Sequence, residues 1–411
     1  MAEQAPPTNP LAREAGTPQA LVLIVANVLP TMGIVALIPI IPQLFAQFHD
    51  FPNANFWVPT IITAPSICIA LLSPLMGAFA DKVGRRKLLL AALFAYAIVG
   101  AAPLLLQTLP AIIASRVLLG ITEAVIYTNV NTLMGDYFQG ETRRKWLAYQ
   151  NAAGSLMATG LIVAGGVLGT VSWRGPFTLY LLAVVIFAAA LKLTWEPSSQ
   201  DEPEADSSGA HGVQFPWAAM LAVVPVTLVS SAVFFIEPLQ LGLVLNARGA
   251  ASPAVIGVVS ATTGFALPLG AYLFGRTKVL RVGQMLSVAY LFFACGFWGL
   301  GTSQSLTGIV IGACLAQFAC GITFPLLITW CQSKLHFEVR ARGMGLWTST
   351  FFIGQFLSTS TVAFLIPRAG GITGVMIWSA LFCIAVAPLG LVADAVSRKR
   401  SQPAPTVLPR A

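Results

Sequence analysis

Three ionisable residues lie inside long apolar stretches of this chain: Arg116, Glu123 and Glu237. If those stretches cross a bilayer, each charge is costly there and marks a functional candidate. A carboxyl group in such a place can bind and release a proton when its burial or a nearby cation changes. The residue types therefore predict proton coupling, with Glu123 as the proton carrier, Arg116 tuning it, and Glu237 as a second proton-coupling residue.

Each of these residues also has a structural alternative. Glu123 could simply neutralise Arg116, and Glu237, which is nearer a helix end, could reach the membrane interface. No histidine can share the proton-carrying task within a helix, because His49, His211 and His336 all fall outside the apolar segments.

The fourth apolar segment carries its polar residues on one face. Arg116 and Glu123 are two helical turns apart and so project from the same side of a helix, and Tyr127 and Asn131 continue that stripe. A helix with one polar stripe is expected to line a water-filled cavity, which makes Tyr127 and Asn131 candidate substrate contacts. Further candidates for this cavity, with interhelical hydrogen bonding as the alternative role, are Asn27, Gln317 and Gln355.

The composition is that of a membrane protein. Hydrophobic residues make up 56% of the 411 residues and charged residues only 9%, against about 25% charged in soluble proteins. The net charge of +8 does not indicate a nucleic-acid partner, because the basic residues cluster between apolar segments. The cysteines lie in apolar runs without the spacing of a zinc site, and no nucleophile constellation occurs. No metal, cofactor or enzymatic activity is therefore predicted.

The apolar segments occur as six, then a polar acidic linker, then six more. A bilayer crossing needs about 20 apolar residues, which these segments approach or exceed. Basic clusters recur at equivalent loops, so the two halves look duplicated. The predicted fold class is an all-α integral membrane protein, with twelve transmembrane helices in two six-helix bundles related by a pseudo-twofold repeat. The predicted segments run over residues 20–45, 57–80, 88–106, 111–134, 146–169, 176–194, 216–244, 253–274, 282–301, 306–332, 343–366 and 373–393.

The charge distribution predicts the orientation. Most of the 23 Lys and Arg residues fall in tails and loops that share one side, and only Arg174, Arg248 and Arg368 fall in loops on the other. By the positive-inside rule, the chain is a multi-pass protein with both termini cytoplasmic. The expected parts are a cytoplasmic tail over 1–19, a bundle over 20–194, a cytoplasmic acidic linker over 195–215, a bundle over 216–394 and a basic cytoplasmic tail over 395–411.

The loop from Gly77 to Lys87 contains a cluster of charged residues between two uncharged apolar runs. It resembles the signature loop of the major facilitator superfamily, G-x-x-x-D-x-x-G-R-R/K. The resemblance implies a cytoplasmic gate made by Asp81, Arg85 and Asp136, with Gly77 and Gly84 allowing close helix approach. Arg116 to Gly120 resembles the family's R-x-x-Q-G motif, with Leu119 in place of glutamine, and this motif is linked to proton transfer.

The resemblance is strongest to the twelve-helix drug/proton antiporters (the arabinose-efflux-permease-like group), on the stretch from Met32 to Pro42. One departure weakens it: the region from Gly154 to Gly166 lacks the Gly-Pro pair usual in the fifth helix of antiporters. The expectation is a secondary transporter that works by alternating access, in the inner membrane of a bacterium.

The leading prediction for function is proton-coupled export of small, mostly apolar organic compounds or drugs. The alternatives are proton-coupled import of a polar metabolite, such as a sugar or organic acid, and a membrane receptor that transports nothing. The expected partners are a small-molecule substrate, protons and the lipid bilayer, with the protein working as a monomer.

Overall fold

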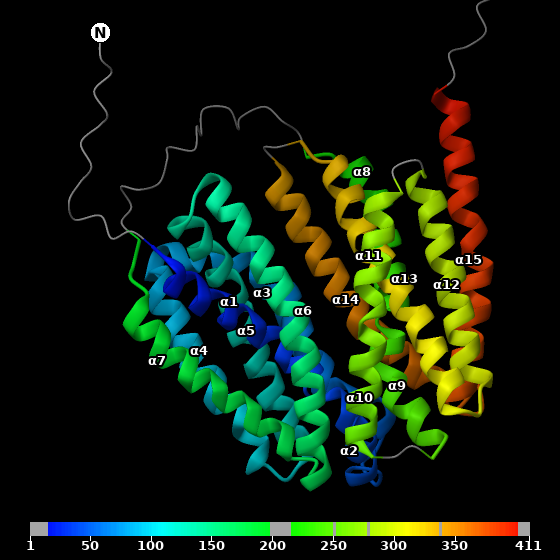
Figure 1. Ribbon diagram of the computed structural model, residues 1–411, viewed down its shortest axis with the longest axis horizontal. Helices are drawn as coiled ribbons and strands as arrows, with labels where there is room; N and C mark the ends of the chain where they lie inside the picture. Colours follow the sequence, from blue (N-terminus) through cyan, green and yellow to red (C-terminus); the bar gives the residue numbers. More distant parts are fainter. Residues whose placement is uncertain (1–14, 198–214, 250–251, 278–279, 337–338, 402–411) are drawn as a thin grey trace, which may run out of the picture.

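The computed structural model describes residues 15–197, 215–249, 252–277, 280–336 and 339–401, and these form helices joined by short loops, with no strand among them (Figure 1). The linker and both tails of the predicted organisation lie largely outside the described residues. At some helix positions only the backbone is described, and Gly77 and Asp81 are among these.

The helices form two groups that stand side by side, drawn blue to green and green to red in Figure 1. The first group comprises α1 Thr17–Val35, η1 Ile38–Ile40, α2 Ile41–Gln47, α3 Ala54–Val83, α4 Arg85–Ala101, η2 Ala102–Leu104, α5 Leu109–Tyr137, α6 Gly140–Val171, η3 Gly175–Leu181 and α7 Leu182–Leu193. The second comprises α8 Trp217–Phe234, α9 Ile236–Ala247, α10 Pro253–Gly264, α11 Ala266–Arg276, α12 Val282–Thr302, α13 Leu306–Ser333, α14 Arg340–Leu365 and α15 Ile372–Ser401.

Every predicted apolar segment coincides with one helix or with consecutive helices, which confirms the all-α membrane fold. Ten spans among the described residues are long and apolar enough to cross a membrane. The other two predicted segments fall on α6 and α14. On α6 the described apolar stretch covers Leu156–Val171. The hydroxyl and amide residues of α14 lower its hydropathy.

Prolines break the predicted seventh segment inside the membrane. Pro238 has no N–H, so the carbonyl of Phe234 loses its helical partner, and α8 ends there while α9 begins at Ile236. The thiol of Cys320 on α13 donates to the freed carbonyl, with an S···O distance of 3.5 Å. The break places Glu237 in the first turn of α9.

Each group of helices has its own hydrophobic core. The core of the first half draws on buried residues from Ala20 to Ala190, with Leu239 added from the second half. Three clusters fill the second half. The two halves are therefore separately packed bodies that meet along a limited interface.

The contacts between the two halves lie along the part of the helices that runs from their middle toward one end of the molecule. We call the end near Thr17 and Ser401 the terminal end and the opposite end the distal end. At the middle of the helices α3 meets α14, where Ser349 Oγ donates to Ala70 O at 2.5 Å. Nearer the distal end α6 meets α10, where a Cβ on Gly166 would lie 2.7 Å from Pro253 O. Among the described residues, these hydrogen bonds and close approaches between the halves lie from about mid-helix to the distal end.

Candidate functional site

Glu123 lies in the middle of α5 and is fully buried. Its carboxyl group packs directly on the backbone of α1, so that a Cβ on Gly33 would overlap Glu123 Oε1. Neither carboxyl oxygen has a hydrogen-bond partner among the described residues. An ionised carboxylate buried without a partner is very costly, and protonation removes that cost. The site therefore has the chemistry of a proton-binding group.

Arg116 is also fully buried, and its side chain hydrogen-bonds to the end of another helix, α4. Its Nη2 donates to Val99 O at 3.1 Å and to Gly100 O at 2.8 Å, both in the last turn of α4. The guanidinium lies 5.2 Å from the Phe177 ring centroid and 5.0 Å from that of Tyr180. The negative end of the α4 dipole and two aromatic faces therefore compensate its charge. It makes no ion pair with Glu123.

Two tyrosines complete the walls around Glu123. Tyr96 on α4 donates to Leu29 O at 2.7 Å, and Tyr180 on η3 donates to Gly33 O at 3.1 Å. Both rings are fully buried and lie 5.5 Å apart between centroids. Sequence reasoning missed both, although a tyrosine hydroxyl within an apolar segment signals a buried hydrogen bond.

The predicted polar stripe divides into two environments. Arg116 and Glu123 point into the core of the first half, whereas Tyr127 is 37% exposed. Asn131 accepts from Gln150 Nε2 on α6 at 3.0 Å. Each four-residue step rotates about 40° around a helix, so two such steps carry the stripe from the core face to another side. The expectation that all four line one water-filled cavity therefore differs from the structure.

The second half holds one buried carboxyl of its own. Glu237 is fully buried, and Gln317 Nε2 on α13 donates to its Oε2 at 2.6 Å. The other oxygen, Oε1, has no hydrogen-bond partner in the described ranges. Gln317, predicted as a substrate contact, instead holds the carboxyl in place.

The other predicted cavity residues lie in two further places. Gln355 on α14 is fully buried at the interface between the halves, where its Oε1 accepts from Ser66 Oγ on α3 at 2.8 Å. This is the interhelical bond that the sequence left as its alternative. Asn27 on α1 is half-buried, and none of the described groups hydrogen-bonds to its Oδ1.

The loop between α3 and α4 brings together part of the predicted gate. Arg85 Nη1 lies 2.6 Å from Asp136 Oδ1, near the terminal end of α5. Gly84 joins the two helices with a φ of +104°, a conformation in which glycine is favoured. The side-chain surroundings of the remaining two predicted gate residues, Gly77 and Asp81, lie outside the described part of the structure.

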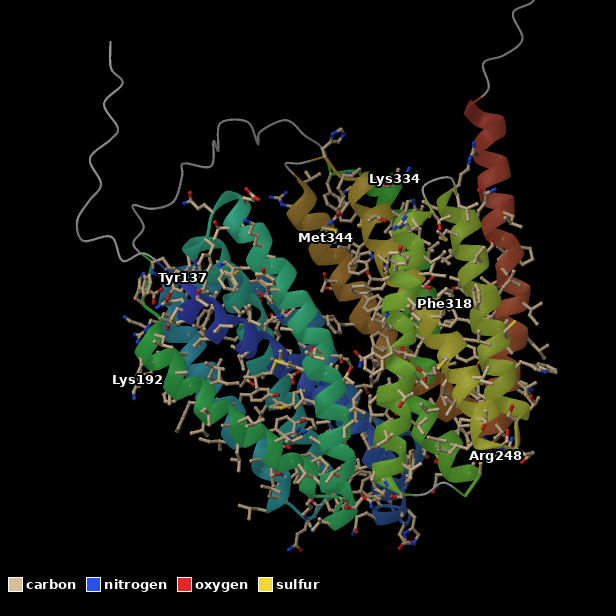
Figure 2. The ribbon with its side chains drawn as sticks, viewed as in Figure 1. Tyr137, Lys192, Arg248, Phe318, Lys334 and Met344 are labelled. Atoms are coloured by element: carbon tan, nitrogen blue, oxygen red, sulfur yellow. The ribbon has the colours of Figure 1, made fainter. Side chains whose placement is uncertain are left out.

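The residues after α7 fasten this loop. Both carboxyl oxygens of Glu196 accept from the Arg86 N–H, at 3.1 and 3.3 Å, at the start of α4. Tyr137, next to Asp136, accepts from the Trp195 N–H at 2.9 Å (Figure 2). Sequence reasoning missed Glu196, which follows directly on the sixth apolar segment.

The sequence profile of the Major Facilitator Superfamily matches residues 23–359, most of the chain. The chain belongs to this superfamily. Its members are transporters and not enzymes, so the buried carboxyls and the loop between α3 and α4 belong to a transport protein.

Distant relatives within the superfamily include drug-resistance proteins. The chain is 28% identical over 176 residues to multidrug resistance protein 1 of Bacillus subtilis, covering 42% of this chain and 43% of that protein. It is 29% identical over 163 residues to the class C tetracycline resistance protein of Escherichia coli, covering 38% and 40%. The matches span less than half the length of these relatives.

Solved superfamily structures share the fold. A bacterial homologue of the human lysosomal transporter Spinster, inward-facing and unoccupied, aligns with a TM-score of 0.75 at 14% identity, covering 95% of this chain and all of that one. A D-xylose-proton symporter aligns with a TM-score of 0.70 at 16% identity, covering 89% and 96%. The fold is therefore that of a secondary transporter of the superfamily.

Proposed function

We propose that this protein is a proton-coupled exporter of small, mostly apolar organic compounds, working by alternating access between its two halves. Glu123 carries the proton. The observation on which the proposal rests is the fully buried Glu123 carboxyl, which accepts no hydrogen bond from the described part of the chain.

The contact with Gly33 supports coupling between the proton and the conformation. Because the carboxyl packs on the α1 backbone, any shift of α1 against α5 changes its surroundings. A shift that admits water lowers the free-energy cost of the ionised Glu123 carboxylate. Closing the site again favours the proton-bound form of this carboxyl. Proton binding to Glu123 and the position of α1 relative to α5 are then coupled, so that each shifts the equilibrium of the other.

Arg116 influences this carboxyl from a distance. Its guanidinium stays bound to the end of α4, so it contributes a fixed positive charge to the core of the first half. Glu237, bound to Gln317, is the corresponding proton-coupling candidate in the second half. The two carboxyls allow each half to respond to protonation.

Location and gate form part of the same proposal. Both termini lie in the cytoplasm of a bacterium, and the protein sits in its inner membrane. With the cross-half contacts near the distal end, the described conformation then faces inward. The Arg85–Asp136 pair belongs to the cytoplasmic gate, with Gly77, Asp81 and Gly84 beside it.

Export is supported by the names of the distant relatives, a multidrug resistance protein and a tetracycline resistance protein. The substrate cavity is proposed to include Asn27, Tyr127 and Asn131, which are not fully buried. The protein is proposed to function as a monomer.

Liposomes that contain the purified protein and an imposed pH gradient test this function. Tetracycline and ethidium should move against their gradients while protons move the opposite way. Movement of a sugar or organic acid together with protons would establish an importer instead. Correctly folded protein that moves neither protons nor any compound of the panel would contradict transport by this route.

A further inference from the structure

An apolar groove lies on the surface of the second half, between α11 and α12. Its volume is about 360 Å³, and α13 forms its floor. Figure 2 shows Phe318 of this floor between the ribbons of the two walls. The lining residues are Ala266 from α11, Phe292 from α12, and Val310, Ile311, Cys314, Leu315 and Phe318 from α13.

Glycine contacts pin both walls to the floor. On α11, Gly270 packs on the Phe318 carbonyl of α13 so closely that a Cβ would overlap it. On α12, a Cβ on Gly296 would lie 2.7 Å from Gly312 O of α13. Among the described residues, α11 and α12 make few contacts with each other. Because close backbone contacts hold each wall against α13, the packing of the three helices sets the width of the groove.

The groove opens onto the surface that faces lipid. Exposed apolar side chains flank it on each helix: Leu269 is 62%, Leu291 51% and Ile311 55% exposed. Val310 and Phe318 lie four and twelve residues after the start of α13 at Leu306, or about 6 and 18 Å at 1.5 Å per residue. In a hydrocarbon core about 30 Å thick, the groove therefore belongs to the leaflet at the distal end.

We propose that this groove binds one acyl chain of a phospholipid from the distal leaflet. Ordered water needs two or more polar partners, and all the lining side chains are hydrophobic. If the groove were empty, the atoms that line it would lack van der Waals contacts on their open side. The volume lies at the lower end of the range of about 300–1,000 Å³ for small-molecule sites, and the surrounding medium is hydrocarbon. This inference is independent of the proposed transport function.

Photocrosslinking in liposomes tests the proposal directly. The probe is a phosphatidylcholine with a diazirine in the middle of one acyl chain, and adducts are mapped by peptide mass spectrometry. We expect adducts to concentrate between Ile311 and Phe318, about fivefold or more above those at Val185 on α7, which is 67% exposed. Adducts that simply follow exposure, with Val185 and Leu221 labelled most, would overturn the site.

Two variants in α11 sharpen the test. Ala266→Trp fills the groove and should lower the α13 adducts about fivefold while leaving α7 adducts unchanged. Leu269→Trp adds the same ring outside the groove and should change neither. If Ala266→Trp does not fold, Cys314→Trp fills the same space from the floor. Unchanged α13 labelling in a folded groove-filling variant would refute the proposal, as would displacement of the lipid by an excess of transported compound.

Discussion

The carboxyl group of Glu123 on α5 packs on the backbone of Gly33 on α1, and within the part of the chain that the structure describes neither carboxyl oxygen meets a hydrogen-bond donor. Only a glycine leaves room for this contact, since any Cβ at position 33 would overlap the carboxyl. The relationship ties the proposed proton carrier on α5 to the backbone of a second helix of the same half.

Gly33→Ala should therefore impair coupling more than folding. The added methyl displaces the Glu123 carboxyl, and we expect uphill transport to fall about tenfold or more, which corresponds to about 1.4 kcal/mol. Uptake rates in liposomes measure this. Gly160→Ala on α6 is the matched control, because nothing lies within 4 Å of its Cβ position. Equal transport by both variants would show that the Gly33 contact has no role.

Arg116→Lys should destabilise the fold although it keeps the charge. Lysine cannot reproduce the paired contacts with Val99 O and Gly100 O, and an unsatisfied buried carbonyl costs about 1–3 kcal/mol. The unfolding midpoint in detergent should fall accordingly. Arg143→Lys, at an exposed position, should change stability by less than about 0.5 kcal/mol. A midpoint unaffected by Arg116→Lys would contradict the capping role.

The Ser66–Gln355 hydrogen bond should favour the conformation described here. Gln355→Leu removes the acceptor at the α3–α14 contact, and Ser66→Ala removes the donor. Each should cost about 0.5–1.5 kcal/mol and shift the population toward the conformation opened at the distal end. Distances between spin labels on the two halves report that shift. In a double-mutant cycle the two effects should not add, and strict additivity would argue against the bond.

Asp136→Asn should slow transport, because it disturbs the loop between α3 and α4. Both members of the Arg85–Asp136 pair are largely buried, so removing one charge breaks an ion pair that is poorly solvated. We expect the transport rate to fall about tenfold. Glu141→Gln breaks an exposed pair with Lys145 at 3.5 Å and should have little effect, because exposed pairs contribute about 0–1 kcal/mol. The same loss in both variants would point to general charge effects.

Hydropathy predicted the helices well because each bilayer crossing is a local property of about 20 residues. The predicted segments and the observed helices differ by a few residues at most ends, apart from the longer α15. The break between α8 and α9 at Phe235 and the break between α10 and α11 at Phe265 were not predicted. Such breaks depend not only on prolines but also on tertiary packing that replaces the lost helical hydrogen bonds.

The candidate site was predicted by residue type but not by partner. Arg116 and Glu123 stood out as charges in apolar sequence, yet their contacts with Gly100 and Gly33 join helices far apart in the chain. The helical stripe also drifts around α5, so Tyr127 faces elsewhere. Hydrogen bonds such as Gln317 to Glu237 arise only from tertiary packing.

The most direct test of the account compares two transport modes of Glu123→Gln in liposomes. Glutamine is close in shape to the protonated carboxyl but cannot release a proton. We expect uphill transport driven by a pH gradient to be lost in Glu123→Gln, while exchange of labelled for unlabelled substrate continues. Undiminished uphill transport by Glu123→Gln would contradict the assignment of Glu123 as the proton carrier.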